Sequence, residues 1–423
     1  MIGFLGKGLL RDRSRSFFPV LTAAFGVFLI IFLKAYFDGA LLNMHNTTAR
    51  HNTGHVKIMT QAYAAESGQS PNDLALMDTE ELLQKLRAEY PGLIWTPRIN
   101  FGGLIDIPDA HGETRVQGPA VGLALDLLGA DTPEINFLNL EKAVIRGRLP
   151  QKPGEILLAE EFAERLQVSP NDTITLISST MYGSMAVNNF TLCGTVRFGI
   201  AAMDKGALIA DIRGIQNALD MQDAAGMILG FFADDNYSDA KAAALKTEFN
   251  ARYQTADEFS PTMRTLIEDS GLGGLFAMSG GTMTVIYIFF VAVMALVLWN
   301  AGLISGIRRY GEMGIRLAIG ESKVHLYVSL LGEAMLIGFC GSLIGTVFGL
   351  LLSYWLQKYG LNYGAIFKNS TIMIENVVRA RVTPVCYFIG FVPGMLATLT
   401  GSALAGLGIF KRQTAQLFKE LET

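Results

Sequence analysis

Long stretches without charge constrain this chain more than any other feature. Residues 270–307 and 382–410 contain no Asp, Glu, Lys or Arg, residues 326–357 contain one charged side chain, and residues 17–33 contain none. A helix that crosses a membrane needs ~20 predominantly apolar residues. The three longer stretches meet this requirement, and Lys34 can extend the shorter one by reaching outward with its ammonium group. The pattern therefore predicts four transmembrane helices.

Composition agrees with a membrane protein. The 423 residues are 50% hydrophobic and only 17% charged, whereas a soluble chain carries about 25% charge. This balance excludes a disordered chain and argues against a purely soluble enzyme. Three cysteines, of which only Cys193 lies outside the apolar stretches, are too few for a disulfide framework or a cysteine-based zinc site. A net charge of −4 gives no support for nucleic-acid binding.

The first apolar stretch has two interpretations. A basic start followed by an apolar core is also the pattern of a cleavable signal peptide. No small-x-small cleavage pattern follows Leu33, so we expect a retained membrane anchor.

The distribution of Lys and Arg predicts the orientation of the spans. Segments 1–16, 307–323 and 411–423 together carry 11 Lys and Arg, and the loop 358–383 carries four. We therefore expect both termini to be cytoplasmic and residues 38–274 to lie outside the membrane.

The predicted fold is an α-helical membrane protein with four transmembrane helices and an α+β extracytoplasmic (periplasmic) domain between helices 1 and 2. The predicted segments are a cytoplasmic start (1–16), the first span (17–37), the outer domain with its stalk (38–274), the second span (275–306), a cytoplasmic helical segment (307–323), the third span (324–357), a short outer loop (358–383), the fourth span (384–410) and a cytoplasmic tail (411–423).

The outer segment has 31 Asp and Glu against 18 Lys and Arg, and its patterning predicts two lobes. Polar residues 38–53 continue the first helix as a stalk, which Gly54 ends. Alternation over 55–59 predicts a strand with one buried face, and residues 78–81 have the form of a helix capping box. Further strands are expected at 94–107, 114–125, 190–196, 207–211 and 227–233, with helices at 160–166 and 239–253 and two more strands within 145–176.

Motifs for catalysis are absent from the sequence. It has no G-x-S-x-G, H-E-x-x-H, C-x-x-C or phosphate-binding loop, so we assign no catalytic residue and no metal site. His51 and His55 have the i,i+4 spacing that can hold a metal, but with His45 they are expected to be solvated stalk residues. Cys193 is expected to be a small core residue.

The segment between the second and third spans is amphipathic. One helical face comprises Ile307, Tyr310, Met313 or Gly314, and Leu317. Arg308, Glu312 and Arg316 form two i,i+4 pairs on the opposite side, each worth ~0.2–0.5 kcal/mol in an isolated helix. Such a helix can lie on the membrane surface or dock on a cytoplasmic partner, and its spacing does not separate the two.

The same segment resembles a known family. Residues 312–320 (EMGIRLAIG), the run LLGEA at 330–334 and the glycine-rich third span are similar to the membrane subunits of the MacB/LolC/LolE/FtsX superfamily of ABC transporters. In the outer domain, residues 145–176 resemble the family's periplasmic core signature, and residues 53–56 and 190–199 are also similar.

The resemblance implies a mechanotransmission mechanism. In it, a separate cytoplasmic ABC ATPase docks on residues 307–323, the coupling helix, and moves the spans, the stalk and the outer domain. It implies that the chain is not itself an enzyme and binds no cofactor directly, since ATP and Mg²⁺ bind to the ATPase. The coupling residues it assigns are Arg308, Arg309, Glu312, Gly314, Arg316, Ala318 and Gly320. The implied setting is the bacterial inner (plasma) membrane, with a second copy or a paralogue as dimer partner.

The cargo remains open between several functions. The absence of an ATPase from this sequence favours a LolC/LolE-type subunit for lipoprotein release or export over a MacB-like efflux permease. An FtsX-like signalling subunit that regulates a cell-wall hydrolase is an alternative, although its outer domain is usually smaller. A membrane-anchored sensor or adhesin without an ATPase is a third.

Small residues recur at four-residue intervals in the predicted spans. The pairs and triplet are Gly302 and Gly306 in the second span, Gly341, Gly345 and Gly349 in the third, and Gly390 and Gly394 in the fourth. Such stripes let helix backbones approach closely, so we expect the third span to pack against a partner helix, within the chain or across a dimer.

Glu333 is the one charge inside the third span. Placing a carboxylate at mid-bilayer costs ~2.5–3.5 kcal/mol even on the permissive insertion scale. We expect a structural role, in which it reaches the membrane surface or pairs with Arg316 or Lys323, in preference to a role in proton coupling.

Overall fold

The computed structural model describes most of the chain. The described residues are 13–109, 111–130, 132–199, 201–269, 310–362 and 377–411, with ten single positions between 284 and 300. They belong to two compact units. Unit 1 consists of Met1–Leu41, Ala277–Leu361 and Val378–Thr423, and unit 2 consists of Leu42–Phe276 and Asn362–Val377.

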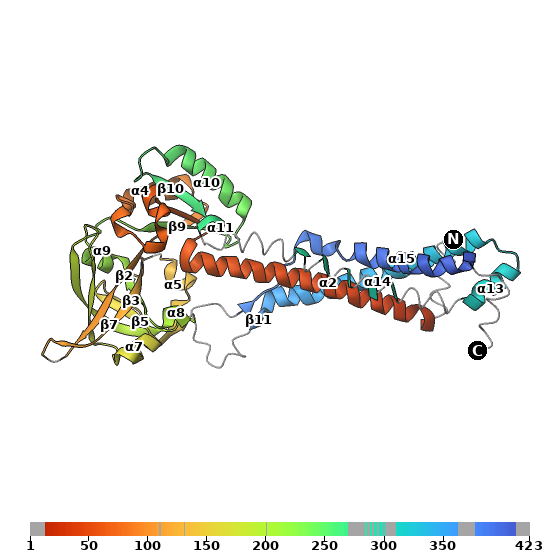
Figure 1. The fold of residues 1–423 in the computed structure, drawn as a ribbon, viewed down its shortest axis with the longest axis horizontal. Coiled ribbons are helices and arrows are strands. Elements are labelled where there is room, and N and C mark those ends of the chain that lie inside the picture. Colours follow the sequence, from red (N-terminus) through yellow and green to blue (C-terminus); the bar gives the residue numbers. More distant parts are fainter. Residues whose placement is uncertain are drawn as a thin grey trace. The chain divides into compact units, whose positions relative to one another are not determined.

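Unit 1 is helical (Figure 1). Its elements are the first part of α2 (Arg13–Thr48), α13 (Tyr310–Ala318), α14 (Lys323–Tyr359), the 3-10 turn η5 (Pro384–Tyr387) and α15 (Phe391–Lys411). A two-stranded sheet pairs β11 (Leu361–Asn362) with β12 (Val377–Val378).

Three helices among the described residues are long and apolar enough to cross a membrane: Phe17–Thr53, Lys323–Tyr359 and Pro384–Leu404. They correspond to the predicted first, third and fourth spans. Most of the predicted second span, 275–306, lies outside the described residues, and its described positions between 284 and 300 are helical. The predicted count of four therefore stays a prediction.

The end of α2 follows the sequence expectation. The helix passes into one π-helical turn, η1 (Ala49–Thr53). Gly54 ends it with φ of 61°, and its N–H donates to the Ala49 carbonyl at 2.8 Å. Glycine suits this position because left-handed φ values strain residues that carry a Cβ.

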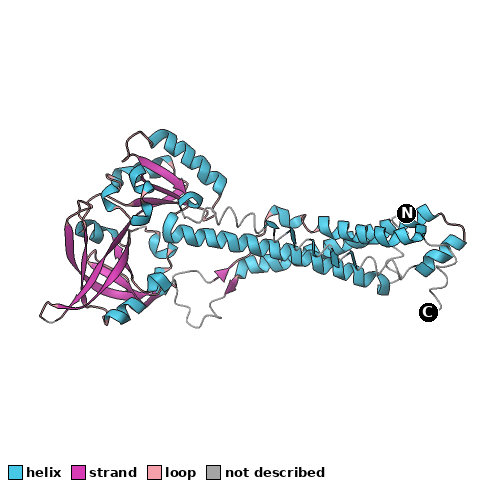
Figure 2. Ribbon diagram, viewed as in Figure 1, coloured by secondary structure: helices cyan, strands magenta, loops and turns pink. Residues whose placement is uncertain are grey.

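Unit 2 is built on one large sheet (Figure 2). Its strands are β1 (Val56–Thr60), β2 (Leu93–Pro108), β3 (Thr114–Leu125), β4 (Val144–Gly147), β5 (Glu155–Ala159), β6 (Thr173–Ser179), β7 (Met185–Val196), β8 (Ala207–Asp211), β9 (Met227–Phe232) and β10 (Pro261–Thr265). The sheet order is β10-β1-β9-β2-β3-β8-β5-β7-β4, and β6 pairs with both β2 and β7.

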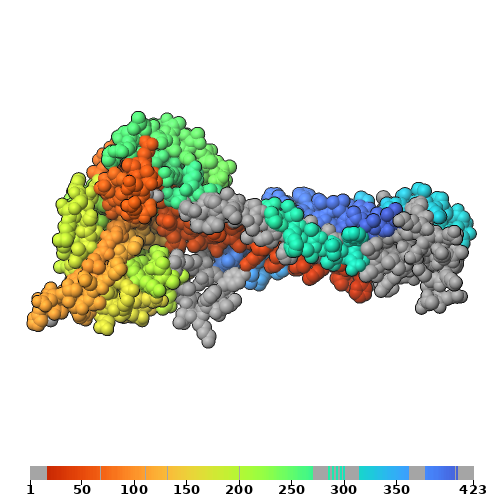
Figure 3. All heavy atoms as spheres, in the orientation of Figure 1, coloured from red at the N-terminus to blue at the C-terminus, as the bar shows by residue number. Residues whose placement is uncertain are grey.

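The double pairing of β6 closes part of this sheet into a barrel. The ring runs β2-β3-β8-β5-β7-β6 and returns to β2. Strands β9, β1 and β10 extend from the first half of β2, which pairs with β9 over Leu93–Arg98, and β4 pairs with β7. Strand β2 therefore belongs to both halves of the unit, and its hairpin with β3 projects from the unit in the space-filling view (Figure 3).

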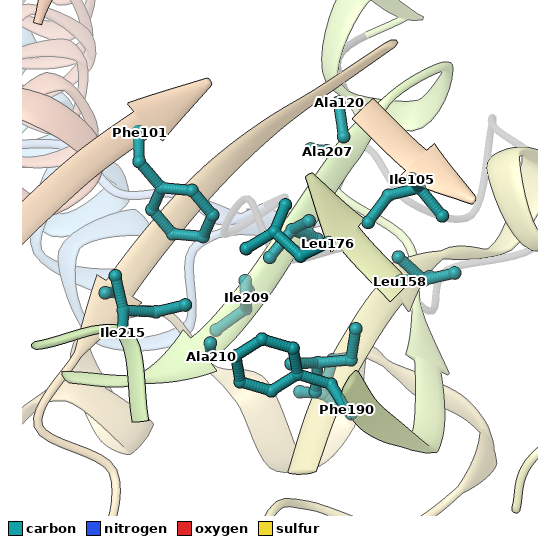
Figure 4. Packing of buried hydrophobic residues seen from close by; sticks show 14 of the residues in the cluster. Phe101, Ile105, Ala120, Leu158, Leu176, Phe190, Ala207, Ile209, Ala210 and Ile215 are labelled. Carbon is teal, nitrogen blue, oxygen red and sulfur yellow. The ribbon is translucent and has the colours of Figure 1, made fainter. Parts of the chain in front are cut away.

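Each half has its own hydrophobic core. Inward side chains of the barrel strands, among them Phe101, Leu176 and Phe190, form the first core (Figure 4). The second core joins Trp95 and the strands β1, β9 and β10 to Leu86 of α4 and Phe249 of α10. The helices of unit 2 are α3 (Gln61–Ala65), η2 (Ser67–Gln69), η3 (Asn72–Leu74), α4 (Thr79–Glu89), α5 (Glu134–Phe137), α6 (Leu140–Ala143), α7 (Glu160–Leu166), α8 (Ala201–Asp204), α9 (Ile212–Ala218), α10 (Asp239–Tyr253) and α11 (Leu266–Asp269).

Three local predictions for this unit are wrong. All five residues of β1 are buried, because the strand lies between β9 and β10 and beneath helices, so it has no solvated face. The capping box does not form: Asp78 has φ of 50° and makes no side-chain cap, and Asp223 instead accepts the Glu80 N–H at 2.9 Å. His55 is fully buried and not a solvated stalk residue.

Candidate functional site

The short helix α13 carries the described part of the predicted coupling segment. Its end is a Schellman motif, in which the Glu321 N–H donates to the Arg316 carbonyl and the Gly320 N–H donates to the Leu317 carbonyl, both at 3.1 Å. Gly320 has φ of +101°, the left-handed conformation that this motif requires and glycine adopts without strain. Gly320 therefore fixes where α13 stops.

The next helix, α14, starts at Lys323, three residues after Gly320. The Ser322 hydroxyl is the N-cap of α14 and accepts the His325 N–H at 3.3 Å. Such a cap satisfies one of the amide groups that every helix start leaves unpaired. The corner between α13 and α14 is thus short and hydrogen-bonded on both sides.

One side of α13 packs on α14 and the other is exposed. Leu317 contacts Leu326 and Leu330, and Gly314 is buried. Ile315 and Ile319 are 49% and 81% exposed, and Arg316 and Ala318 are exposed beside them. The predicted division into a packed and an open face therefore holds for residues 314–318. The open face offers apolar side chains and a cation.

Several predicted site residues lie outside the described part of the chain. Arg308 and Arg309 precede the first described residue of α13, and Gly302 and Gly306 fall in the same gap. Glu312 lies within α13, but its side chain is outside the described residues. The two i,i+4 pairs proposed for this face stay predictions.

The glycine triplet of α14 packs on α2 in unit 1. A methyl carbon added to Gly341 would lie 2.5 Å from the Ala23 Cβ, and one added to Gly349 would lie 3.1 Å from the Ile31 Cβ. Added to Gly345, it would overlap the Ala24 carbonyl oxygen and lie 2.8 Å from the Val27 Cβ. The three glycines meet α2 at successive turns, so the partner helix that the sequence left open is α2 of the same chain.

Helix α15 joins the same packing. A methyl group on Gly394 would lie 2.9 Å from Val27 Cγ2 of α2, and one on Gly338 would lie 3.0 Å from the Gly394 carbonyl oxygen. Gly390 also faces Val27. Small residues thus bring α2, α14 and α15 together at backbone distance.

Glu333 lies on α14 and is half-buried in unit 1. It is neither fully enclosed nor on an open surface. Its proposed structural role stays a prediction.

Unit 2 contains no metal-binding cluster of three or more His, Cys, Asp or Glu among its described residues. His55 Nδ1 accepts the Phe232 N–H at 2.9 Å, which occupies the lone pair that a metal would need. Burial raises the pKa of the Cys193 thiol to about 12, and the thiol donates to the Ile156 carbonyl. The expectation that Cys193 is a core residue is confirmed.

An open pocket of about 550 Å³ lies beside the end of β6, the middle of β2 and the turn η3. Its lining residues are Ser70, Pro71, Asn72, Asp73, Gly102 and Ser178–Gly183. This lining includes no histidine, cysteine or lysine that could activate one of its serines as a nucleophile. The lining residues of this pocket therefore include no Ser–His or Ser–Lys pair.

Sequence reasoning missed two buried ion pairs in unit 2. Arg98 and Glu134 are 1% and 0% exposed and lie 2.7 Å apart, and Lys57 and Asp269 are 5% and 3% exposed at 2.5 Å. A charged residue in a strand pattern normally indicates a solvated face, so neither pair gave a signal in the sequence.

Comparison with known proteins decides the class of unit 1. Residues 284–414 match the profile of the FtsX-like permease C-terminal family. This stretch, less than a third of the chain, is similar to the C-terminal domain of FtsX-like permeases. The resemblance to the MacB/LolC/LolE/FtsX superfamily is thereby confirmed at the level of the FtsX-like permease, a membrane subunit, and α13, α14 and α15 lie inside the matched stretch.

Other comparisons add little to this assignment. No match was found among the curated proteins. Among solved structures, the periplasmic region of MacB from Actinobacillus actinomycetemcomitans is similar at 13% identity and a TM-score of 0.33, covering 50% of this chain and 88% of that one. A TM-score of this size does not establish a shared fold. The similarity to FtsX-like permeases rests on residues 284–414.

Proposed function

We propose that this chain is the membrane subunit of a mechanotransmission-type ABC transporter, driven by a separate cytoplasmic ATPase that binds α13. The match of residues 284–414 to FtsX-like permeases carries the proposal, because such permeases work with an ATPase that hydrolyses ATP on their behalf. Helix α13 is the short amphipathic helix of the matched stretch, joined by a tight corner to the long helix α14.

The packing of unit 1 supports a route for the motion. Leu317 links α13 to the first turns of α14 through Leu326 and Leu330. The glycine triplet then links α14 to α2 at backbone distance. Close-packed elements transmit displacement because they resist compression. A push on α13 would therefore reach α2.

In this proposal unit 2 acts on cargo outside the membrane. The cargo is a lipid-modified protein that is released from the membrane or exported, and two such chains, identical or paralogous, work as a dimer. The acidic balance of residues 38–274 suits a folded domain in the aqueous phase. An FtsX-like signalling role and MacB-like efflux are the alternatives, and the second experiment below tests the signalling role.

The first experiment tests the ATPase contact. Gly314→Pro removes a helical hydrogen bond inside α13 and clashes with the preceding turn, and Glu312→Lys reverses a charge on the same helix. We expect either change to abolish co-purification of the ATPase and coupled ATP hydrolysis in reconstituted vesicles, with membrane insertion unchanged. Glu141→Lys, an exposed charge reversal in unit 2, is the matched control and should keep both. Full coupled activity in both α13 variants would show that the ATPase binds elsewhere.

The second experiment tests the cargo. Vesicles containing the chain, its ATPase and a lipid-modified protein should release that protein on ATP addition. The same protein without its lipid, tethered by a transmembrane helix, is the control and should stay bound. Activation of a cell-wall hydrolase without any release would favour the signalling alternative.

A further inference from the structure

The end of the α2 helix is held in unit 2 by a buried guanidinium. Arg98 of β2 donates from Nη2 to the Arg50 carbonyl at 2.7 Å and from Nη1 to the His51 carbonyl at 3.1 Å. Both carbonyls belong to η1, the last turn of the long helix. Carbonyls at a helix end have no partner within the helix, and a cation there is also favoured by the helix dipole.

The same guanidinium is paired on its other side. Its Nε donates to Glu134 Oε1 at 2.8 Å and its Nη2 donates to Oε2 at 2.7 Å, a two-point contact. Thr96 donates to Glu134 Oε1 at 2.8 Å. Arg98 and Glu134 are almost fully buried, so water does not compete for these hydrogen bonds.

Arg98 stands where the two halves of unit 2 meet. On β2 it pairs with Met227 of β9 in the outer extension and with Leu125 of β3 in the barrel. Residues before it on β2 pair with β9, and residues after it pair with β3 and β6. A displacement of η1 that moves Arg98 would therefore act on both halves at once.

A second, more exposed contact holds the same helix from another side. Asp235, in the loop after β9, accepts an ion-pair contact from Arg50, and its backbone carbonyl accepts from Asn46 Nδ2 at 2.9 Å. Directly after η1, the His55 N–H donates to the Gly230 carbonyl at 2.9 Å. The helix end is thus bonded to β2 and to the β9 region.

Stability alone does not explain a buried ion pair at this place. Apolar residues of similar volume often stabilise a protein as well as a buried pair or better. The pair fixes geometry, because a two-point Arg–carboxylate contact holds the guanidinium in one orientation. Here that fixed guanidinium also holds two consecutive carbonyls of one helical turn.

We infer that Arg98 and Glu134 are positioning residues that fasten the end of the α2 helix to the shared strand β2, so that motion of the helix is passed into both halves of unit 2. The inference rests on the proposed function, since ATP must first move α2. It assigns the transfer of motion to this contact and not to general packing of the two halves.

The test uses the full chain with its ATPase in lipid nanodiscs, and follows amide hydrogen exchange with and without a non-hydrolysable ATP analogue. Arg98→Met/Glu134→Leu removes the pair with little change of volume. Arg148→Met/Glu155→Leu is the matched control, because it removes another two-point Arg–Glu contact, at 2.6 and 2.7 Å, whose described bonds do not involve α2 or η1.

In the wild type and the control we expect the analogue to change exchange at η1 and at β2, β3 and β9. In the Arg98→Met/Glu134→Leu variant the change at η1 should persist, and the changes at β2, β3 and β9 should be lost. ATP hydrolysis should continue in all three. Changes at the strands that persist in this variant would overturn the inference.

The remaining outcomes are distinguishable. If the wild type shows no nucleotide-dependent change at η1, the result contradicts the proposed function itself, and not only the inference about Arg98 and Glu134. If the double variant exchanges its strands rapidly without nucleotide, it is misfolded, and Arg98→Lys replaces it. Lysine keeps a charge beside Glu134 but lacks the planar fork of donors, so a weakened strand response is expected, and a full wild-type response would overturn the inference.

Discussion

The interiors of the two units are held together by different kinds of contact. In unit 1 the helices α2, α14 and α15 meet through glycines and small side chains at backbone distance. In unit 2 a closed barrel and its strand extension enclose two apolar cores, and two ion pairs are buried near these cores. In unit 2, apolar character determines which side chains lie in the interior. In unit 1 it cannot determine which face of a helix is buried, because the helices are apolar on every side.

The outer surface of α14 makes the same point. Large apolar side chains such as Phe348 and Trp355 are 61% and 53% exposed, while the buried positions of that helix are largely Gly, Ser, Ala and Thr. In lipid, burying a large apolar side chain between helices gains little, because the lipid tails are equally apolar, and close backbone approach selects the partner. From this comparison we expect substitutions to destabilise the two units through different kinds of contact.

The largest expected effect is in unit 2. Lys57→Met leaves the Asp269 carboxylate buried without its cation, and breaking a buried pair in this way typically destabilises by about 3–5 kcal/mol. The measurement is amide hydrogen exchange of β1 in the full chain, which reports the local free energy of opening. Lys57→Met/Asp269→Leu should recover most of the loss.

A surface pair provides the control for this prediction. Lys241 and Asp234 are 65% and 52% exposed and 3.8 Å apart, so Lys241→Met should change the free energy by less than about 0.5 kcal/mol. Equal changes of free energy in Lys57→Met and Lys241→Met would contradict the expectation that buried ion pairs stabilise unit 2 more than exposed ones.

The next effect is in unit 1. Gly345→Leu forces a side chain against the Ala24 backbone, where even a methyl group overlaps the carbonyl oxygen. Overpacking of this kind costs about 1–3 kcal/mol where the surroundings can shift, and the backbone of α2 shifts less easily than a side chain. We expect loss of the α2–α14 contact, measured as the yield of a disulfide between cysteines placed at exposed, neighbouring positions of the two helices.

Ile344, the residue before Gly345, is the control position for this prediction. Ile344 is 42% exposed, so Ile344→Leu should leave the disulfide yield unchanged. A Gly345→Leu variant that crosslinks as well as this control would mean that the glycine triplet does not select the partner helix.

The elements that follow from local pattern were predictable from the sequence, and those that depend on distant residues were not. The stalk's end at Gly54 and the strand at 114–125 are set by nearby residues, and both lie where predicted. The glycine triplet predicted a close helix contact but not its partner, because spacing on one helix says nothing of the facing helix. Closure of the barrel depends on β6 pairing with β2 some 70 residues earlier, and no local pattern reports that.

The candidate site divides in the same way. Gly320 was predicted as a coupling residue, and that role stays a prediction. The structure shows a different property of this residue, the left-handed conformation that ends α13. Arg98 and Glu134 gave no signal, because Arg98 is a single charged residue in a strand and Glu134 a single charged residue in a short helix. Only the fold brings these two residues together, 36 positions apart in the sequence. The failed capping box has a similar cause, since Asp223 from a distant loop takes the amide of Glu80.

The smallest expected effect concerns pH and is confined to unit 2. Burial lowers the pKa of His55 to about 4, with Arg50 and His45 adding to the shift and Asp235 and Asp234 opposing it. The folded state therefore holds the neutral imidazole, whose Nδ1 accepts the Phe232 N–H. Protonating that nitrogen removes the acceptor and places a charge in a fully buried position.

The sign of the effect follows from linkage. The unfolded chain binds the proton at its ordinary pKa of 6.5 and the folded chain only near 4, so the stability that the neutral histidine contributes is present above pH 6.5 and is lost as the pH falls toward 4. Between pH 7 and pH 5 the loss is about 2 kcal/mol. It should appear as faster exchange of the β9 amides, while the exchange of α14 in unit 1, corrected for the intrinsic pH dependence, stays the same.

Two variants sharpen the assignment. His55→Leu should reduce the pH dependence of β9, whatever it does to stability at neutral pH, because it removes one of the groups that titrate. A smaller dependence should remain, because burial also lowers the pKa of His51 in η1 to about 4. His111→Leu, at an exposed position, should leave the dependence as in the wild type. A pH dependence of β9 that is undiminished in His55→Leu would show that His55 is not a titrating group. An equal pH dependence in α14 would contradict the expected difference between the two units.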